Sequence, residues 1–256
     1  MGEAACELLA QEGAAVAVID IHEKSGKEVA RRIRDRGGQA LFIKCNVTSE
    51  AQVKSSILRT VREFGRLDII VNCAGIVHVG MLHDYTEREW DLLMNINVKS
   101  IFFSVKHGIA HLRKAGRGYV VNIGSIGSFI AQSQTPAYTT SKGAVLQLSR
   151  SIAVDYAADG VRCNCICPGI TDTPMLRYHL SKTPDPEAAL TTRLKRVPMG
   201  IALTPHDIAK SVLYFSCEDS AGVTGTSLIV DCGYTTAVEW EVQGQTAFQK
   251  QPRSRK

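Results

Sequence analysis

The sequence predicts an α/β protein built on a doubly wound parallel sheet, and three observations support this fold class. Apolar runs of strand length alternate with segments of helical periodicity. The strands read as continuous apolar runs, as strands buried on both faces do. The repeated strand-helix-strand order places helices on both faces of a parallel sheet, with a ligand crevice at the carboxyl ends of the strands.

The expected elements follow one another along the chain in this order. The first strand is the apolar run AVAVI, and the helix after it is strongly charged. Strands are predicted at residues 15–19, 41–43, 67–71, 119–123, 161–167 and 227–230. Helices are predicted at residues 23–36, 50–64, 86–114, 138–158 and 205–216, whereas residues 175–200 read as a loop-rich stretch.

Composition and charge exclude several classes of protein. The 256 residues are 45% apolar and 21% charged, an ordinary globular balance that argues against a disordered or collagenous chain. No apolar run approaches the ~18 residues of a membrane span. The formal charge of +5 includes four cations in a basic, polar tail at residues 243–256, so the body carries only +1. We therefore expect one domain at residues 1–242, with no nucleic-acid and no membrane partner.

The cysteines and the first residues give expectations about location and metals. Eight cysteines are scattered through apolar runs, which favours reduced thiols in a cytoplasmic protein. Cys163, Cys165 and Cys167 share one face of a predicted strand. No second cluster of ligands accompanies them, so we expect small buried side chains and no metal site. Because the first residues lack an apolar stretch, we expect no secretory leader.

The strongest local signal is Tyr138-Thr139-Thr140-Ser141-Lys142. Side chains four residues apart lie on one face of a helix, so the Lys142 ammonium can stabilise an ionised Tyr138, whose reference pKa is ~10. Ser125 stands at the end of a predicted strand, where its hydroxyl can meet the same substrate oxygen. The three residues together predict a catalytic constellation.

At this point the chain resembles the classical short-chain dehydrogenase/reductase family, from Gly2 to about Tyr234. Five motifs agree with the family in order and spacing. They are Asn72-Cys73-Ala74-Gly75, Asn97 in Asn97-Val98-Lys99-Ser100, Ser125 thirteen residues before Tyr138, Pro168-Gly169-Ile170-Thr171-Asp172-Thr173, and Val230-Asp231-Cys232-Gly233. The resemblance implies a Rossmann-like fold and redox chemistry.

The resemblance also implies catalytic roles. Tyr138 would be the general acid/base while hydride moves to or from a nicotinamide. Lys142 would lower the pKa of Tyr138 and hold the nicotinamide ribose, and Ser125 would hydrogen-bond the reacting oxygen. Asn97 would position a water that links Lys142 to solvent. Two structural alternatives stay open: Asn97 as a residue that caps or kinks its helix, and Ser125 as a turn residue.

Asp20 predicts the cofactor. An acid at the end of the strand after the phosphate-binding glycines accepts bonds from the ribose 2′-hydroxyl and repels a 2′-phosphate, which favours NAD over NADP. An N-cap role for Asp20 is the alternative. The resemblance assigns the remaining cofactor contacts, with Asn46 in place of the usual aspartate. The full predicted set is Gly2, Asp20, Asn46, Val47, Asn72, Ala74, Gly75, Tyr138, Lys142, Pro168, Gly169, Ile170 and Thr173.

The amino-terminal end departs from the family pattern. Met1-Gly2-Glu3-Ala4 looks like the last glycine of the family's phosphate loop and the start of the next helix. We therefore expect an N-terminally incomplete fold whose first, central strand is missing between residues 15–19 and 67–71. Strands that lose their backbone partners leave buried amides unsatisfied, at ~1–3 kcal/mol each. The printed chain is accordingly expected to bind NAD weakly.

Two functions follow as hypotheses. The first is an oxidoreductase that transfers hydride between NAD(H) and a secondary alcohol or ketone. The second is a catalytically silent short form that acts through subunit association. In either case the resemblance implies a homodimer or homotetramer, assembled through residues 86–114 and 138–158. The stretch at residues 175–200 corresponds to the family's lid, and Val77, His78, Gln132, Met175, Leu176 and Leu180 are candidates for contact with the substrate.

Overall fold

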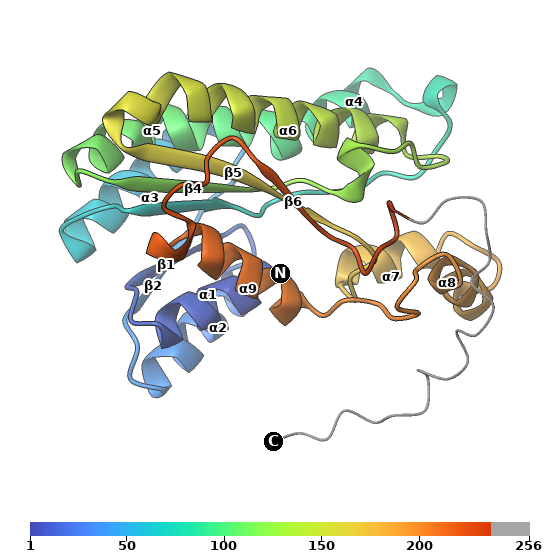
Figure 1. The fold of residues 1–256 in the computed structure, drawn as a ribbon, viewed down its shortest axis with the longest axis horizontal. Coiled ribbons are helices and arrows are strands. Elements are labelled where there is room, and N and C mark those ends of the chain that lie inside the picture. Colours follow the sequence, from blue (N-terminus) through green and yellow to red (C-terminus); the bar gives the residue numbers. More distant parts are fainter. Residues whose placement is uncertain (237–256) are drawn as a thin grey trace.

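Parallel strands form the centre of the molecule (Figure 1). The structure, a computed structural model, describes residues 1–236; the predicted basic tail at 243–256 lies outside the described residues. The strands are β1 (Val16–Asp20), β2 (Ala40–Lys44), β3 (Ile69–Asn72), β4 (Gly118–Ile123), β5 (Val161–Pro168) and β6 (Ser227–Val230). Every strand pairing is parallel, as the sequence predicts.

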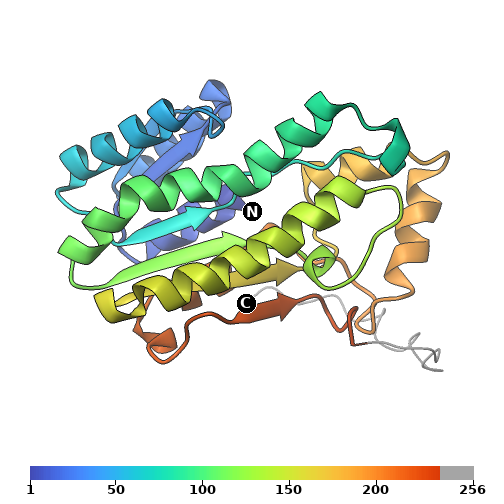
Figure 2. The ribbon, with the colours of Figure 1, turned by 90° about the horizontal axis from the view of Figure 1, so that it is seen from above.

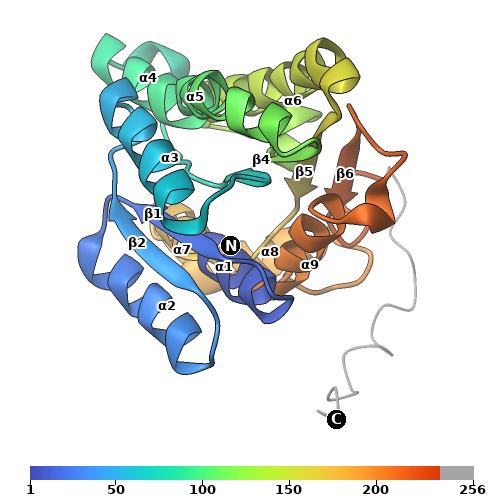
Figure 3. The same ribbon diagram turned by 90° about the vertical axis from the view of Figure 1, so that its left-hand side faces the viewer.

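The strands form two hydrogen-bonded groups. β1 pairs only with β2, whereas the other four strands pair in the order β3-β4-β5-β6. Within residues 1–236, no ladder joins β1 to β3, and Figure 3 shows the β1-β2 pair set apart from the larger sheet. This is the position at which the sequence analysis expects a missing central strand.

Helices cover both faces of the strands (Figures 1 and 3). One face carries α1 (Gly2–Gln11), α2 (Glu23–Asp35) and α9 (Pro205–Phe215). The opposite face carries α3 (Glu50–Phe64), α4 (Glu87–Met94), α5 (Ser100–Lys114) and α6 (Pro136–Tyr156). Two shorter helices, α7 (Pro174–Leu180) and α8 (Pro186–Leu194), follow the carboxyl end of β5, and Figure 2 shows them beyond the ends of the strands.

Two apolar clusters hold the layers together. The larger one joins Leu9 of α1 and Val16 of β1 to Val121 of β4 and to α9, so it spans both groups of strands. The second lies between β4, β5, α5 and α6 and contains the three cysteines of β5, each fully buried as predicted. Because one core connects both groups of strands, the chain forms a single-domain α/β fold.

Two of the predicted elements differ from the structure. The helix expected at 86–114 is interrupted by a π-helical turn, Asn95–Lys99, between α4 and α5. The stretch expected to be loop-rich at 175–200 contains α7 and α8, so that prediction was wrong. Both helices start with a proline behind a side-chain cap: Thr173 accepts from the Leu176 amide at 3.3 Å, and Asp185 from the Ala188 amide at 2.9 Å. Proline at the first helical position and an oxygen cap stabilise even short helices.

No helix in residues 1–236 is both long and apolar enough to cross a membrane. In the same part of the chain, no three histidine, cysteine, aspartate or glutamate side chains gather where they could hold a metal ion.

Candidate active site

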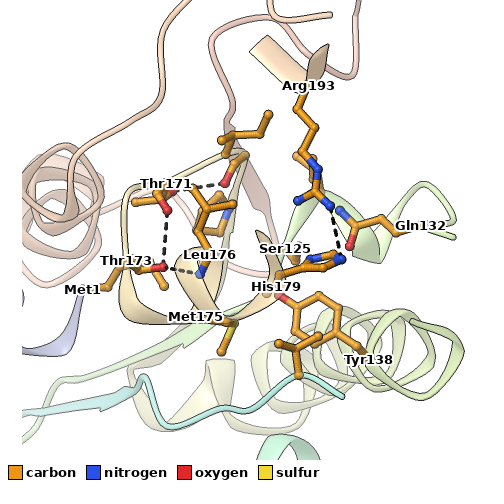
Figure 4. Close-up of a pocket in the computed structure, with 16 residues that line it drawn as sticks. Met1, Ser125, Gln132, Tyr138, Thr171, Thr173, Met175, Leu176, His179 and Arg193 are labelled. Carbon is orange, nitrogen blue, oxygen red and sulfur yellow. Dashed lines mark hydrogen bonds between the residues drawn. The ribbon is translucent and has the colours of Figure 1, made fainter. Parts of the chain in front are cut away.

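A small cavity opens where β4 and β5 end, and the predicted catalytic residues Ser125 and Tyr138 line it (Figure 4). Its volume is ≈ 110 Å³. Four predicted cofactor residues, Pro168, Gly169, Ile170 and Thr173, also line it. The cavity therefore brings together residues that lie up to 48 positions apart in the chain, from Ser125 to Thr173. This agrees with the expectation of a crevice at the carboxyl ends of the strands.

Lys142 lies one helical turn after Tyr138 on α6, and its side chain is not among those that line the cavity. Its Nζ donates to the main-chain oxygen of Ile123 at 2.8 Å and lies 5.6 Å from the centroid of the Tyr138 ring. Only 5% of Lys142 is exposed, whereas Tyr138 is partly exposed to the cavity. In the described chain no carboxylate is paired with Lys142, so its charge faces Tyr138 and the strand end.

Ser125 combines the two roles that the sequence leaves open. It is a turn residue, because it caps the 3₁₀ turn Ile126–Ser128, and its Oγ accepts from the Gly127 amide at 3.0 Å. That bond uses an acceptor site and leaves the hydroxyl proton able to donate to a ligand oxygen. Ser128 Oγ donates to the main-chain oxygen of Lys142 at 2.7 Å, which ties the turn to α6.

Asn97 sits in the π-helical turn and is 1% exposed. Its Oδ1 accepts from the Ile76 amide at 2.8 Å, while Nδ2 donates to Ile76 oxygen at 3.0 Å and to Ser141 Oγ at 2.9 Å. The side chain thus fixes the loop after β3 to α6, beside Lys142. π-helical turns often occur at functional sites. The predicted water beside Asn97 stays a prediction.

Gly75 lies where this loop passes the buried lysine. A Cβ at Gly75 would stand 3.4 Å from Asn97 Oδ1 and 3.6 Å from Lys142 Nζ. Any larger side chain there would fill the space beside both groups. The predicted neighbours Gly2 and Ala74 lie nearby, since a Cβ at Gly2 would stand 3.5 Å from the sulfur of Cys73.

The residues predicted to hold the adenosine end lie at the other group of strands. Asp20 ends β1 with an exposed carboxylate whose Oδ1 accepts from the His22 amide at 2.8 Å. His22, not Asp20, is the N-cap position of α2, so the capping alternative is not what the structure shows. Asn46 Oδ1 accepts from both the amide and the hydroxyl of Thr48, at 3.0 and 2.8 Å, and Val47 is partly buried beside it.

Asn72 belongs to a polar network that the sequence analysis does not anticipate. Its Nδ2 donates to Asn122 Oδ1 at 2.8 Å, and its Oδ1 accepts from Ser104 Oγ at 2.8 Å. Asn122 in turn donates to Ser149 Oγ at 2.9 Å. The network links β3, β4, α5 and α6 behind the cavity, so the Asn72 side chain is engaged within the protein. In the sequence, the available signal for this network was the presence of polar residues at the ends of apolar strands.

The loop after β5 is held close to β6. A Cβ at Gly169 would stand 2.7 Å from Asp231 Cα, closer than real contacts, so only glycine fits there. Ile170 oxygen accepts from the Leu203 amide at 2.8 Å, and Thr173 caps α7. These contacts fix the rim of the cavity against the last strand.

Two lid residues line the cavity that the sequence analysis did not select, His179 of α7 and Arg193 of α8. Their side chains point toward each other over the cavity in Figure 4, with Arg193 Nη2 3.2 Å from His179 Nε2. Burial, and then the charge of Arg193, lowers the pKa of His179. Their separation from the other site residues in sequence hides them from motif reasoning.

The substrate-contact candidates divide into two groups. Val77, Gln132, Met175 and Leu176 line the cavity, as expected. Leu180 is 7% exposed and is not among the lining residues. His78 is also absent from the lining; its ring stands edge-on to Tyr85, with the centroids 4.8 Å apart.

Comparison with known proteins identifies the family. A family model described as enoyl-(acyl carrier protein) reductase matches residues 1–235. Dehydrogenase/reductase SDR family member 6 from Xenopus laevis is 37% identical over 236 residues, which cover 92% of this chain and 93% of that protein. Cyclopentanol dehydrogenase from Comamonas testosteroni is 36% identical over 235 residues, 92% of each chain.

A solved structure gives the same result. The crystal structure of a gluconate 5-dehydrogenase from Burkholderia cenocepacia, in complex with NADP and tartrate, superposes with a TM-score of 0.86 at 30% identity and covers 92% of this chain and 91% of that chain. The matches span both groups of strands, both helix layers and the cavity. The chain belongs to the short-chain dehydrogenase/reductase family of oxidoreductases.

Proposed function

We propose that this oxidoreductase interconverts a secondary alcohol and a ketone with NAD(H), using Tyr138 as general acid/base. The observation that carries the proposal is the placement of Ser125 and Tyr138 in one cavity, with Lys142 buried behind them. The cyclopentanol dehydrogenase relative is named for a secondary alcohol. The cavity supplies the groups that such a reaction needs.

Each residue has a distinct task in this proposal. Ser125 donates a hydrogen bond from its hydroxyl to the substrate oxygen, because the bond that it accepts from the Gly127 amide leaves the hydroxyl proton free. Tyr138 then gives a proton to that oxygen in reduction or takes one in oxidation. The Lys142 charge favours the ionised tyrosine, since a neighbouring cation lowers a phenol pKa. The nicotinamide, when bound, supplies or accepts the hydride.

The described residues fit a dinucleotide along the carboxyl edge of the strands. α1 begins with no side-chain cap at Met1, so its first amides can face an anion such as a pyrophosphate. Asp20 offers an exposed carboxylate at the end of β1, and Ser125 and Tyr138 line the cavity together with Met1, the residue before α1. Gly75 keeps the space beside Lys142 open. These residues would hold adenosine ribose, pyrophosphate and nicotinamide in that order.

The preference for NAD over NADP rests on Asp20. The gluconate 5-dehydrogenase was solved with NADP, so the family relationship alone does not select one cofactor. The Asp20 carboxylate is exposed and is followed by Ile21, so no arginine stands directly beside it to receive a 2′-phosphate. We expect Asp20→Asn to weaken NADH binding roughly tenfold or more and to improve NADPH binding, since a charged hydrogen bond and a charge repulsion disappear together. Cofactor fluorescence titrations would measure both affinities.

Replacement of Tyr138 tests the catalytic role. Tyr138→Phe removes one hydroxyl, and we expect kcat to fall about 10²- to 10⁴-fold while NADH affinity stays unchanged. The chain offers a matched control: Tyr178 on α7 and Lys182 just after that helix form a second Tyr-x-x-x-Lys pair outside the cavity lining, with Lys182 Nζ 4.9 Å from the ring centroid. Tyr178→Phe should leave kcat intact. Equal activity of both variants would reject the proposed role.

We further propose that the protein assembles as a homodimer or homotetramer through α5 and α6. Phe102 is 49% and Val154 is 79% exposed on these helices, which is unusual for large apolar side chains. Sedimentation of the purified chain would measure its mass. If the chain assembles but binds no dinucleotide, the alternative of a silent subunit replaces the enzyme.

A further inference from the structure

Arg193 lines the cavity and carries a positive charge that has no ion-pair partner among the described residues. Arg193 is partly buried, and none of the residues 1–236 places a carboxylate within ion-pair distance of it. No aspartate or glutamate lines the cavity. Among the described residues that line the cavity, Arg193 is the one side chain with a permanent charge. A cation partly removed from water without a partner is unfavourable, so an anion that enters the cavity would be stabilised beside it.

A neighbouring arginine shows the contrast. Arg177 on α7 is 72% exposed and binds Asp172 through both Nε and Nη2, at 3.2 and 3.3 Å. That pair lies outside the cavity lining. Arg177 is therefore paired with a carboxylate at the surface, whereas Arg193 lines the cavity without a carboxylate partner among the described residues.

His179 orients the Arg193 guanidinium. Arginine has only donors, so the contact at 3.2 Å requires His179 Nε2 to accept and the ring to be neutral, with its proton on Nδ1. Burial and the charge of Arg193 both lower the pKa of His179, which keeps the ring in that state. One nitrogen of Arg193 is thereby fixed, and its remaining N–H groups stay available to a ligand in the fork geometry that suits a carboxylate.

We propose that the substrate is a small hydroxy acid or keto acid whose carboxylate binds Arg193 while its carbinol or carbonyl oxygen meets Ser125 and Tyr138. This inference rests on the proposed alcohol and ketone chemistry of the same cavity. Figure 4 shows Arg193 and Gln132 near one side of the cavity, with Ser125 and Tyr138 also exposed to it.

The test compares acids with their uncharged amides. The probes are 3-hydroxybutanoate, 4-hydroxypentanoate and 5-hydroxyhexanoate, each beside its primary amide, so that the distance from charge to carbinol is varied while the size is matched. We expect the wild-type chain to prefer one acid over its amide roughly 10- to 100-fold in kcat/KM, the range expected for charge-assisted hydrogen bonds. Arg193→Gln should remove this preference, so that the acid and its amide react with similar kcat/KM.

Two further variants control for structure. Lys195→Gln removes an exposed cation two residues away, outside the cavity, and should keep the preference for the acid. Arg193→Lys keeps the charge but loses the fork, and should retain part of the preference. If Arg193→Gln fails to fold, the comparison between the wild type and Arg193→Lys still decides the question.

Calorimetric titration of the acids in the presence of NADH separates this inference from the proposed redox function. If the amides react as well as the acids, and Arg193→Gln changes neither, the anion site is rejected while the enzyme function stands. If an acid binds the wild type but not Arg193→Gln, and no alcohol or ketone reacts, the anion site stands and the redox function fails. Absence of both binding and preference rejects the anion site.

Discussion

Gly124 lies between Ile123, whose main-chain oxygen accepts from Lys142, and Ser125 of the cavity. We expect even a methyl group at this position to lower the stability of the fold. A Cβ at this position would stand 2.7 Å from Cys165 Sγ, 3.0 Å from Cys167 Sγ and 3.1 Å from Ser128 Oγ. All three contacts are closer than ordinary packing allows. Neither side can move easily, because both cysteines are fully buried and the Gly124 amide donates to Ile166 oxygen at 2.7 Å.

The expected loss follows from overpacking. Gly124→Ala should lower the free energy of unfolding by ~1–3 kcal/mol, the usual range when a methyl group enters a filled core. Cys165→Ala removes the nearest sulfur and leaves a small cavity. In the double variant the new methyl group fills that space, so the double should be at least about 1 kcal/mol more stable than the sum of the single effects predicts.

Urea unfolding of the full chain, followed by circular dichroism, measures all three values. Gly143→Ala on α6 is the matched control, since its Cβ meets nothing within 4 Å. This control should be stabilised by roughly 0.5–1 kcal/mol, because alanine suits a helix interior better than glycine. If the two single effects at Gly124 and Cys165 simply add, or Gly124→Ala is as stable as wild type, the steric argument is refuted.

Three further results are expected. His179 should titrate below its usual pKa by NMR, and Arg193→Gln should move the pKa back toward 6.5; because the folded pKa is depressed, the stability that this histidine contributes is present above pH 6.5 and lost as the pH falls through the folded value. Thr173→Ala should cost about 1 kcal/mol in thermal unfolding, since it removes the cap on the Leu176 amide. Burial raises the pKa of Cys163 to about 12, so a thiol reagent at pH 8 should label it only after urea is added.

The sequence predicts the parts of the site that depend on local geometry. Tyr138 and Lys142 share a helix face because the helical period brings positions four apart together. Ser125 follows a strand end, and strand ends in a parallel sheet meet at one edge. The parallel sheet could also be predicted, since a regular alternation of strands and helices admits few topologies.

The polar network behind the cavity could not be predicted in this way. Asn72 and Asn122 face each other only because β3 and β4 pair in register, Asn72 opposite Asn122. Their further partners come from α5 and α6. A pattern along one chain shows that a polar residue interrupts an apolar run, but it does not show which residue on another element satisfies it.

The sequence prediction for the lid, residues 175–200, missed two features for different reasons: the helices α7 and α8, and the place of Arg193 in the cavity. Its helices carried local signals, Thr173-Pro174 and Asp185-Pro186, that the polar composition of the stretch outweighed in the prediction. Arg193 carried no local signal at all. The role proposed for Arg193 depends on the packing of α7 and α8 beside the cavity. There the arginine contacts His179, and no carboxylate of the described residues pairs with it.

The two ends of the proposed cofactor site are positioned by different forces. Ser125 stands on strands that are joined by backbone ladders, whereas Asp20 stands on β1, which in residues 1–236 is not paired with β3. What relates Asp20 to Ser125 is therefore the apolar cluster in which Leu9 and Val16 contact the β4 side of the core. Side-chain packing lacks the fixed register that backbone hydrogen bonds impose. The distance between the adenosine and nicotinamide ends is thus set by packing, while the position of Ser125 is set by the sheet.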